Sequence, residues 1–333
     1  MKKLLVTGIL CLSSFVVNAA EEVNIYSYRQ AYLIEPVLEA FTAETGIKAN
    51  IVYAKKGLVE RLQREGEFSP ADVVLATDIS RVVEFSDKGL SQALSSDVIN
   101  ANIPAQYRDP ENHWFALTLR VRNIYSAKTL GDLSGIAFED LTDEKYKGQI
   151  CTRSGKHPYN VALVASLIAH HGEAGAREWL QGVKANLARR PQGNDRAQVK
   201  AIKEGLCSVA LGNSYYFGKM LNNEEQKPWA DAVNINFPNQ KDRGAHVNVS
   251  GMVLTKYAPN KTNAVRLMEY LSGDQAQEIY ASVNMEYPVK PGVKNSELVD
   301  SWGTFEADDL ALETIARNRP AALKLLDEVK FDL

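Results

Sequence analysis

The chain has 333 residues, and its 38 basic and 41 acidic side chains give a formal net charge of −3. This slightly acidic balance argues against a nucleic-acid-binding protein, which needs a basic surface. The length exceeds what one compact core usually holds, so we expect two lobes.

The first residues predict export. Two lysines follow the initiator methionine, and residues 4–17 form an apolar run that is too short to span a bilayer. Small residues at Ala19 and Ala20 mark the cleavage site, and we assign residues 1–19 to a signal peptide. Cys11 is preceded by no small residue, so we do not interpret it as a lipid-attachment site. Since no later segment is apolar enough to cross a membrane, we expect a soluble mature chain.

Short apolar strands alternate with amphipathic helices in the first part of the chain. We expect strands over residues 23–28, 48–53 and 71–76, and helices over residues 34–45 and 56–65. A βαβαβ order of this kind predicts a parallel sheet that is covered on both faces.

A longer extended run over residues 114–125 is predicted to cross into a second lobe, where the pattern repeats. There we expect strands over residues 150–152, 206–211, 232–237 and 247–255, and helices over 160–171, 174–187, 198–205, 260–271, 274–283 and from 309 onward. Two α/β lobes joined by extended crossings form a hinged cleft, with ligands bound beyond the carboxyl ends of strands.

Adjacent tyrosines, Tyr215 and Tyr216, are the most informative feature of the chain. Neighbouring side chains of a strand point to opposite faces, but both can reach one ligand at a strand-to-helix turn. Gly212 and Asn213 end an apolar run here, and Ser214 is a natural N-cap for a helix that begins at Tyr215.

A third tyrosine, Tyr159, lies in another polar loop that opens onto an apolar helix. Converging phenols bind hard, highly charged cations, and a ferric ion can remove the phenol proton although the usual pKa is about 10. Zinc and copper would favour imidazole and thiolate ligands instead. The alternative is that all three are ordinary half-buried tyrosines.

Two cysteines remain after the signal peptide, Cys151 and Cys207. An even number in an exported chain predicts one disulfide, and each cysteine lies beside an apolar strand-like stretch. A two-cysteine site for a soft metal is the alternative, but no histidine spacing supports it.

Arginines near the expected cleft could bind an anion. Arg29 follows the first strand, and Arg120 and Arg122 share one face of the crossing strand. Guanidinium groups suit a bidentate oxyanion such as carbonate, although they could equally be surface salt-bridge partners. We expect His157 and His246 to be solvated loop residues rather than ligands.

Several stretches together resemble the periplasmic ferric-ion-binding proteins of ABC transporters, particularly their tyrosine-rich branch. The similarity runs nearly end to end, over residues 23–29, 69–73, 153–155, 191–196, 212–216 and 248–251. The Asn-Ser-Tyr-Tyr sequence of residues 213–216 is the most specific of these motifs.

The resemblance implies an α/β, type II two-lobe fold that binds Fe(III) through Tyr159, Tyr215 and Tyr216, together with a carbonate-like synergistic anion. Some relatives add a histidine from the first-strand loop, but this chain has Gln30 and Ala31 there, so that ligand is missing. The resemblance further implies a monomeric, non-enzymatic periplasmic protein that delivers iron to an inner-membrane ABC permease.

We assign residues 20–118 plus about 245–295 to the N-terminal lobe, and about 119–244 plus about 296–333 to the C-terminal lobe. An alternative is that the same fold binds an oxyanion, polyamine or sugar phosphate through the arginines. A rival of another class is an exported hydrolase, but Ser154 lacks a nucleophile-elbow pattern and the chain lacks a phosphate-binding loop.

Overall fold

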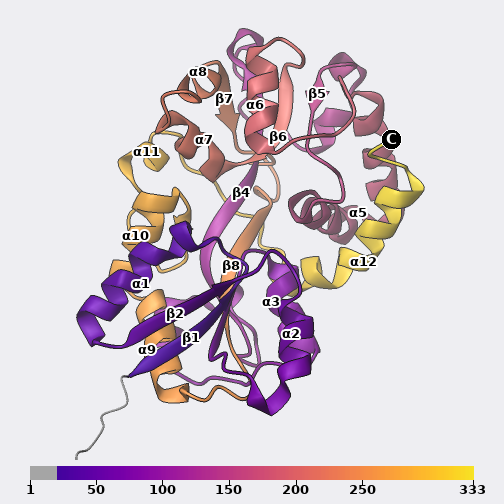
Figure 1. Cartoon of the computed structure of the whole chain (residues 1–333). Coiled ribbons are helices and arrows are strands. Elements are labelled where there is room, and N and C mark those ends of the chain that lie inside the picture. The colour runs from indigo at the N-terminus through magenta and orange to yellow at the C-terminus, as the bar shows by residue number, and fades with distance from the viewer. Residues whose placement is uncertain (1–20) are drawn as a thin grey trace, which may run out of the picture.

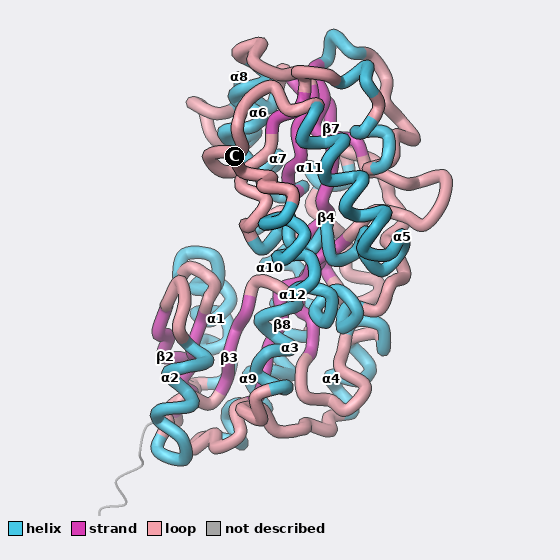
Figure 2. Tube along the Cα trace, turned by 90° about the vertical axis from the view of Figure 1, so that its right-hand side faces the viewer, coloured by secondary structure: helices cyan, strands magenta, loops and turns pink. Residues whose placement is uncertain are grey.

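The computed structural model describes residues 21–333, so the predicted signal peptide and Cys11 lie outside the described residues. The chain forms two α/β lobes, one above the other in Figure 1. We call them the lower lobe, which contains β1–β3, α1–α4, α9 and α10, and the upper lobe, which contains β5–β7 and α5–α8 (Figures 1 and 2).

The lower lobe begins with the predicted βαβαβ unit. Strands β1 (Glu22–Ser27), β2 (Lys48–Tyr53) and β3 (Val73–Ala76) are parallel, with β1 in the middle. Helices α1 (Ala31–Thr45), α2 (Leu58–Glu65) and α3 (Ile79–Asp87) follow the three strands in turn. All four residues of β3 are buried, as expected for a strand covered on both faces. Gly46 ends α1 at a φ of 73°, which glycine adopts without strain.

Strand β4 (Phe115–Ala127) is the predicted crossing strand, and it runs from the lower lobe into the upper lobe (Figure 2). Its residues up to Val121 pair with β8 (Val247–Leu254) and β9 (Tyr287–Pro288). Its residues from Arg122 onward pair with β6 (Val209–Asn213) and β7 (Val233–Asn236). The sheet order within the described chain is β2-β1-β3-β8-β4-β6-β5.

The upper lobe contains β5 (Ile150–Cys151), which pairs parallel with β6. Its helices are α5 (Pro158–Ala185), α6 (Asp195–Lys203), α7 (Ser214–Leu221) and α8 (Lys227–Ala230). The backbone of α5 leaves the helical conformation at Gly172, where φ is 70° and ψ is 173°. This break lies between the two predicted helices, which span residues 160–171 and 174–187.

The remaining helices complete both lobes. They are α4 (Asp97–Asn102), α9 (Lys261–Ser272), α10 (Asp274–Asn284), α11 (Glu297–Asp300) and α12 (Leu312–Glu328). Short 3-10 helices span Gly66–Phe68, Ala105–Tyr107, Lys128–Leu130, Glu139–Thr142 and Glu144–Tyr146.

Helix α12 packs against both α5 of the upper lobe and α3 of the lower lobe. It therefore links the two lobes, as strand β4 also does. The predicted lobe boundaries remain a proposal, and the change of pairing partners along β4 after Val121 lies close to the proposed boundary at residue 118. No helix of residues 21–333 combines the length and the apolar character that a membrane span requires.

Candidate metal centre

Two of the three predicted tyrosines lie on the first turn of α7, directly after β6. The helix begins at Ser214 with Asn213 as its extended N-cap residue, so the prediction of Ser214 as the N-cap is wrong by one position. The physical reason is tertiary: the side chain of Asn213 accepts a hydrogen bond from Arg122 at 3.0 Å, and its backbone N–H donates to Asp195. The strand-to-helix turn nevertheless directs Tyr215 and Tyr216 to one region.

The third tyrosine, Tyr159, lies on the first turn of α5. Its backbone N–H donates to Nδ1 of His157, the N-cap residue, at 3.3 Å. The hydroxyl oxygens of Tyr159 and Tyr215 are 3.2 Å apart, and the ring centroids of Tyr215 and Tyr216 are 4.2 Å apart. The structure thus gathers the three tyrosines at the amino ends of two upper-lobe helices.

The phenol groups of Tyr215 and Tyr216 are held in their neutral form. Burial, followed by the neighbouring Tyr159 and Tyr216, raises the pKa of Tyr215 well above its usual value. Burial, Tyr159 and Asp195 raise the pKa of Tyr216 to about 12. A ligand cation must therefore displace phenol protons at neutral pH, which favours an ion of high charge.

The described residues form no metal site of the usual kind, built from histidine, cysteine or carboxylate side chains. Among residues 21–333, no three histidine, cysteine, aspartate or glutamate side chains gather in a way that could hold a metal ion. Phenol oxygen is consequently the best candidate metal ligand in this part of the chain, and it suits a hard cation.

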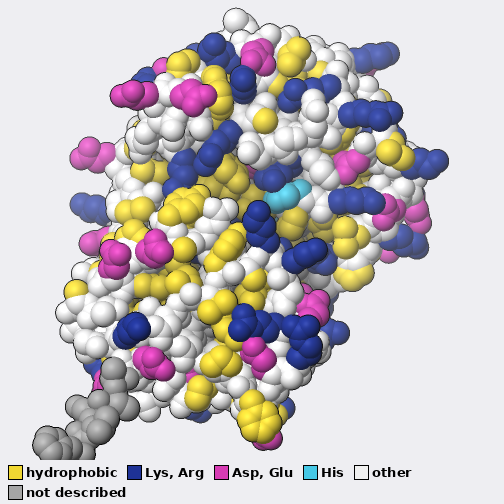
Figure 3. Space-filling model, viewed as in Figure 1, with side chains coloured by type: hydrophobic (Ala, Val, Ile, Leu, Met, Phe, Trp, Pro, Cys, Tyr) yellow, Lys and Arg dark blue, Asp and Glu magenta, His cyan; other side chains and the backbone are white. Residues whose placement is uncertain are grey.

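Arginines surround the three rings, and lysine and arginine side chains gather across the middle of the face in Figure 3. The guanidinium carbons of Arg120 and Arg153 lie 5.6 and 5.2 Å from the ring centroid of Tyr159. That of Arg196 lies 5.3 Å from the centroid of Tyr216. Sequence reasoning missed Arg153 and Arg196 as site residues, although both belong to stretches that carried the family resemblance.

The arginines that we expected to bind an anion have protein partners. Arg29 donates to Glu286 at 2.8 Å, and the two side chains are 4% and 5% exposed. Arg120 donates to the backbone carbonyls of Thr77 and Val249. Their partners are buried or belong to the backbone, so the alternative of surface salt bridges is wrong for both residues.

Arg122 donates from Nη1 to Asp195 at 2.7 Å, in a site where both side chains are buried. Asp195 also accepts from Arg153 at 3.0 Å and from the N–H of Asn213 at 2.9 Å. Burial alone would raise the pKa of Asp195, but Arg122 and Arg153, with this hydrogen bond, lower it below its usual value. Arg122 is thus a buried structural partner as well as a neighbour of the cluster.

The predicted solvation of two histidines is not observed. His246 is buried, and burial together with Arg122 lowers its pKa to about 3. His157 is half-buried, and burial together with Arg153 lowers its pKa to about 3. Both pKa values correspond to neutral imidazoles at neutral pH, because burial penalises the charged form.

The loop after the first strand presents no obvious additional ligand for a metal ion that is held by the upper lobe. Gln30 is the N-cap residue of α1 and is exposed, and Ala31 begins the helix. The Tyr28 hydroxyl accepts the N–H of Leu58 at 3.1 Å, and the guanidinium of Arg81 lies over the Tyr28 ring at 4.3 Å. Tyr28 is therefore already engaged within the lower lobe.

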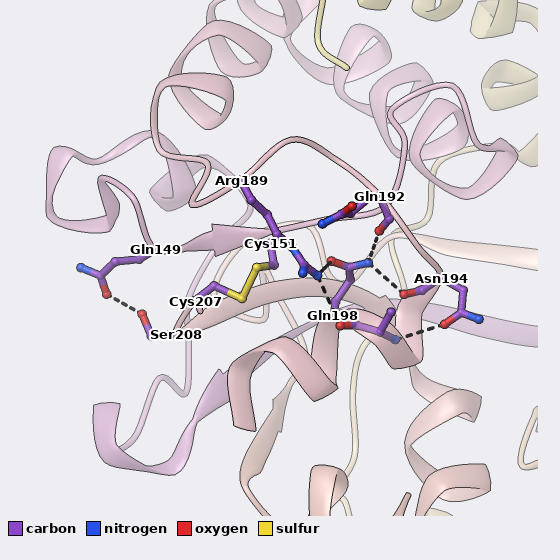
Figure 4. Close-up of a disulfide and its surroundings, with 9 residues drawn as sticks. Gln149, Cys151, Arg189, Gln192, Asn194, Gln198, Cys207 and Ser208 are labelled. Atoms are coloured by element: carbon purple, nitrogen blue, oxygen red, sulfur yellow. Dashed lines mark hydrogen bonds between the residues drawn. A yellow bond between two sulfur atoms is a disulfide. The ribbon is translucent and has the colours of Figure 1, made fainter. Parts of the chain in front are cut away.

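The predicted disulfide between Cys151 and Cys207 is confirmed (Figure 4). Cys151 ends β5, and it lies opposite Ala210 of β6 in the parallel pair. The bond spans 56 residues of sequence with a Cα–Cα distance of 5.9 Å. It therefore ties together the two strands whose chain continues to Tyr159 and to Tyr215.

Comparison with known proteins places the chain among transport proteins. The family model described as bacterial extracellular solute-binding protein matches residues 50–302. The chain is 39% identical to iron uptake protein A1 of Synechocystis over 312 residues, which cover 92% of this chain and 87% of that protein.

Two solved structures show the same fold over nearly the whole chain. The apo ferric ion-binding protein A of Pasteurella haemolytica is 56% identical, with a TM-score of 0.90 and coverage of 94% of this chain and 99% of that chain. The Trichodesmium protein IdiA (FutA), in complex with iron and citrate, is 39% identical, with a TM-score of 0.89 and coverage of 93% and 99%. The two-lobe type II fold is thus confirmed.

Proposed function

The chain belongs to the bacterial extracellular solute-binding protein family, and within it we propose a protein that binds Fe(III) and delivers it to an ABC permease of the inner membrane. The observation that carries this proposal is the convergence of Tyr159, Tyr215 and Tyr216 at two helix amino ends. The relatives are named for iron uptake and ferric-ion binding, which supports the same cargo.

The chemistry of the cluster suits a ferric ion. Three phenols become three phenolates when they bind, and their charge balances that of Fe(III). Each phenolate is a hard oxygen donor, which matches a hard cation. We assign Tyr159, Tyr215 and Tyr216 as the protein ligands, all of them from the upper lobe.

The ligand set implies an order of events. Iron binds first to the upper lobe, because the three proposed ligands lie on α5 and α7. The lobes then close around the ion to the extent that the closed state binds it better than the open state. Strand β4 and helix α12, which contact both lobes, are segments where this motion would be accommodated.

A small oxyanion completes the iron coordination in this proposal. The Trichodesmium relative holds citrate together with iron, which supports an anion in this chain too. Arg153 and Arg196 are the best-placed arginines, because each contacts a proposed ligand ring and has a buried Nε that lacks a partner among residues 21–333. An anion role for Arg29, Arg120 and Arg122 remains a prediction, and the Glu286 partner of Arg29 argues most strongly against that residue.

The predicted signal peptide and the family support a location in the periplasm, where we expect the protein to act as a monomer. The test is an iron-affinity measurement by competition with a chelator, using the mature protein and its Tyr215→Phe and Tyr216→Phe variants. We expect one tight site in the parent and a loss of orders of magnitude in each variant, with circular dichroism unchanged. Equal iron affinity in the parent and both variants would refute the ligand assignment.

A further inference from the structure

We infer that Asp195 is the positioning residue of the iron site: one buried carboxylate that orients the segments bearing all three tyrosine ligands. The inference rests on the proposed function, and it adds a residue that touches none of the ligands directly. Asp195 is the first residue of α6 and is 0% exposed.

Both carboxylate oxygens of Asp195 are occupied by donors from other elements. Oδ2 accepts from Nη1 of Arg122 on β4 at 2.7 Å and from the N–H of Asn213 on β6 at 2.9 Å. Oδ1 accepts from Nη1 of Arg153 at 3.0 Å. A buried carboxylate of this kind holds its partners in one arrangement, because each lost bond would leave a buried polar group unsatisfied.

One branch of this network leads to Tyr215 and Tyr216. Asn213 is the N-cap residue of α7, and it stands two positions before Tyr215. Its backbone donates to Asp195, and its side chain accepts from Arg122. The start of α7, and with it the direction of the two adjacent phenols, is therefore fixed against the Asp195 carboxylate.

The other branch leads to Tyr159. Nη2 of Arg122 donates to Oδ1 of Asn160 at 2.6 Å, and Asn160 follows Tyr159 directly on α5. The amide of Asn160 in turn donates to the carbonyl of Arg153 at 3.1 Å. The same arginine that lies over the Tyr159 ring is thus bonded to Asp195 from one side and to Asn160 from the other.

The charges of the network also favour a bound phenolate. Arg122 and Arg153 carry two positive charges, and Asp195 neutralises one of them. The remaining positive charge lies beside the phenols that must become anionic when iron binds. Without the carboxylate, two buried guanidinium groups would repel each other and lose the acceptor that sets their positions.

The test compares Asp195→Asn with Asp72→Asn, a matched control in the lower lobe. Asp72 is also 0% exposed, and it accepts from the backbone N–H groups of Asn24 and Asn260 at 2.7 and 2.6 Å. For the parent and both variants we would measure chelator-competed iron affinity, the phenolate-to-iron absorption maximum and the urea unfolding midpoint.

We expect Asp195→Asn to weaken iron binding by about 10- to 100-fold, the usual effect of removing a group that orients metal ligands, and to move the absorption maximum. Asp72→Asn should lower the unfolding midpoint and leave both the iron affinity and the absorption maximum of the parent unchanged. Parent-like affinity and absorption in Asp195→Asn would overturn the inference, as would equal iron-site effects in the two variants.

Asn160→Ala covers the case in which Asp195→Asn does not fold. This variant cuts the branch from Arg122 to Tyr159 without leaving a new buried charge, and it should weaken iron binding and shift the absorption maximum. Unchanged affinity and absorption in Asn160→Ala would also overturn the inference. Failure of the parent itself to bind iron would refute the proposed function instead, so the two failures are distinguishable.

Discussion

Acidification should release iron steeply, because each phenol that binds the metal has to lose its proton. Two of these phenols hold their protons tightly: burial raises the pKa of Tyr216 to about 12 and raises the pKa of Tyr215 well above its usual value. If three phenols exchange protons for iron, the apparent association constant should fall about 1,000-fold for each unit of pH, one factor of ten per proton. Replacing Tyr215 by phenylalanine removes one proton and should reduce this dependence to about 100-fold.

The assay is chelator competition between pH 5.5 and 7.5, with a chelator whose own iron affinity is known at each pH. The difference in pH dependence between the parent and Tyr215→Phe reports the proton of one phenol, because protonation of the chelator and of the anion affects both proteins equally. Tyr280→Phe is the matched control: Tyr280 is also a buried tyrosine, but it packs in the lower lobe beneath Arg29. This control should keep the full pH dependence of the parent.

Two results would refute this reasoning. One is a parent protein whose affinity changes by only about tenfold per pH unit, which would mean that a single proton is displaced. The other is an identical pH dependence in the parent and in Tyr215→Phe, which would exclude the Tyr215 phenol as a ligand.

Three further outcomes follow from other parts of the structure. Glu286→Gln leaves the buried Arg29 without its counter-charge and should lower the free energy of unfolding in urea by about 3–5 kcal/mol, whereas a loss below about 1 kcal/mol would contradict the buried pair. Thiol titration of the denatured, non-reduced protein should detect neither Cys151 nor Cys207, and two reactive thiols would disprove the disulfide. Hydrogen bonds outweigh burial and lower the pKa of Glu139 to about 2. The stability that Glu139 contributes to the folded protein is therefore complete above pH 4.5 and is lost as the pH falls toward 2. Because Glu139 is partly exposed, we expect Glu139→Gln to remove only about 1 kcal/mol of this acid-dependent stability, measured as the difference between urea unfolding at pH 5 and pH 3.

The secondary structure was largely predictable because hydrophobic periodicity and glycine breaks act locally. The continuous apolar residues of β3 and the break at Gly172 are both local signals, and both are confirmed. The sequence also indicated that Tyr215 and Tyr159 could lie near each other, since each follows a polar loop and stands at the start of a helix. The helix start at Ser214 was missed by one residue, because Asn213 is held by bonds from distant segments.

The polar partners behind the site could not be predicted, because they connect residues far apart in the chain. Arg29 and Glu286 are separated by 257 positions, and Arg122 and Asp195 by 73. Nothing in the local sequence around Arg29 distinguishes a residue that binds an anion from one that is paired inside the lower lobe. Only the folded chain brings the carboxylates to these arginines.

The central claim is that phenol oxygens bind ferric iron, and the visible spectrum tests it most directly. Stepwise addition of Fe(III) to the mature protein should produce a phenolate-to-iron charge-transfer band that rises to one iron per chain. Tyr159→Phe, Tyr215→Phe and Tyr216→Phe should each weaken or abolish this band while the protein stays folded. A colourless iron-loaded parent, or a band that all three variants retain unchanged, would contradict the account.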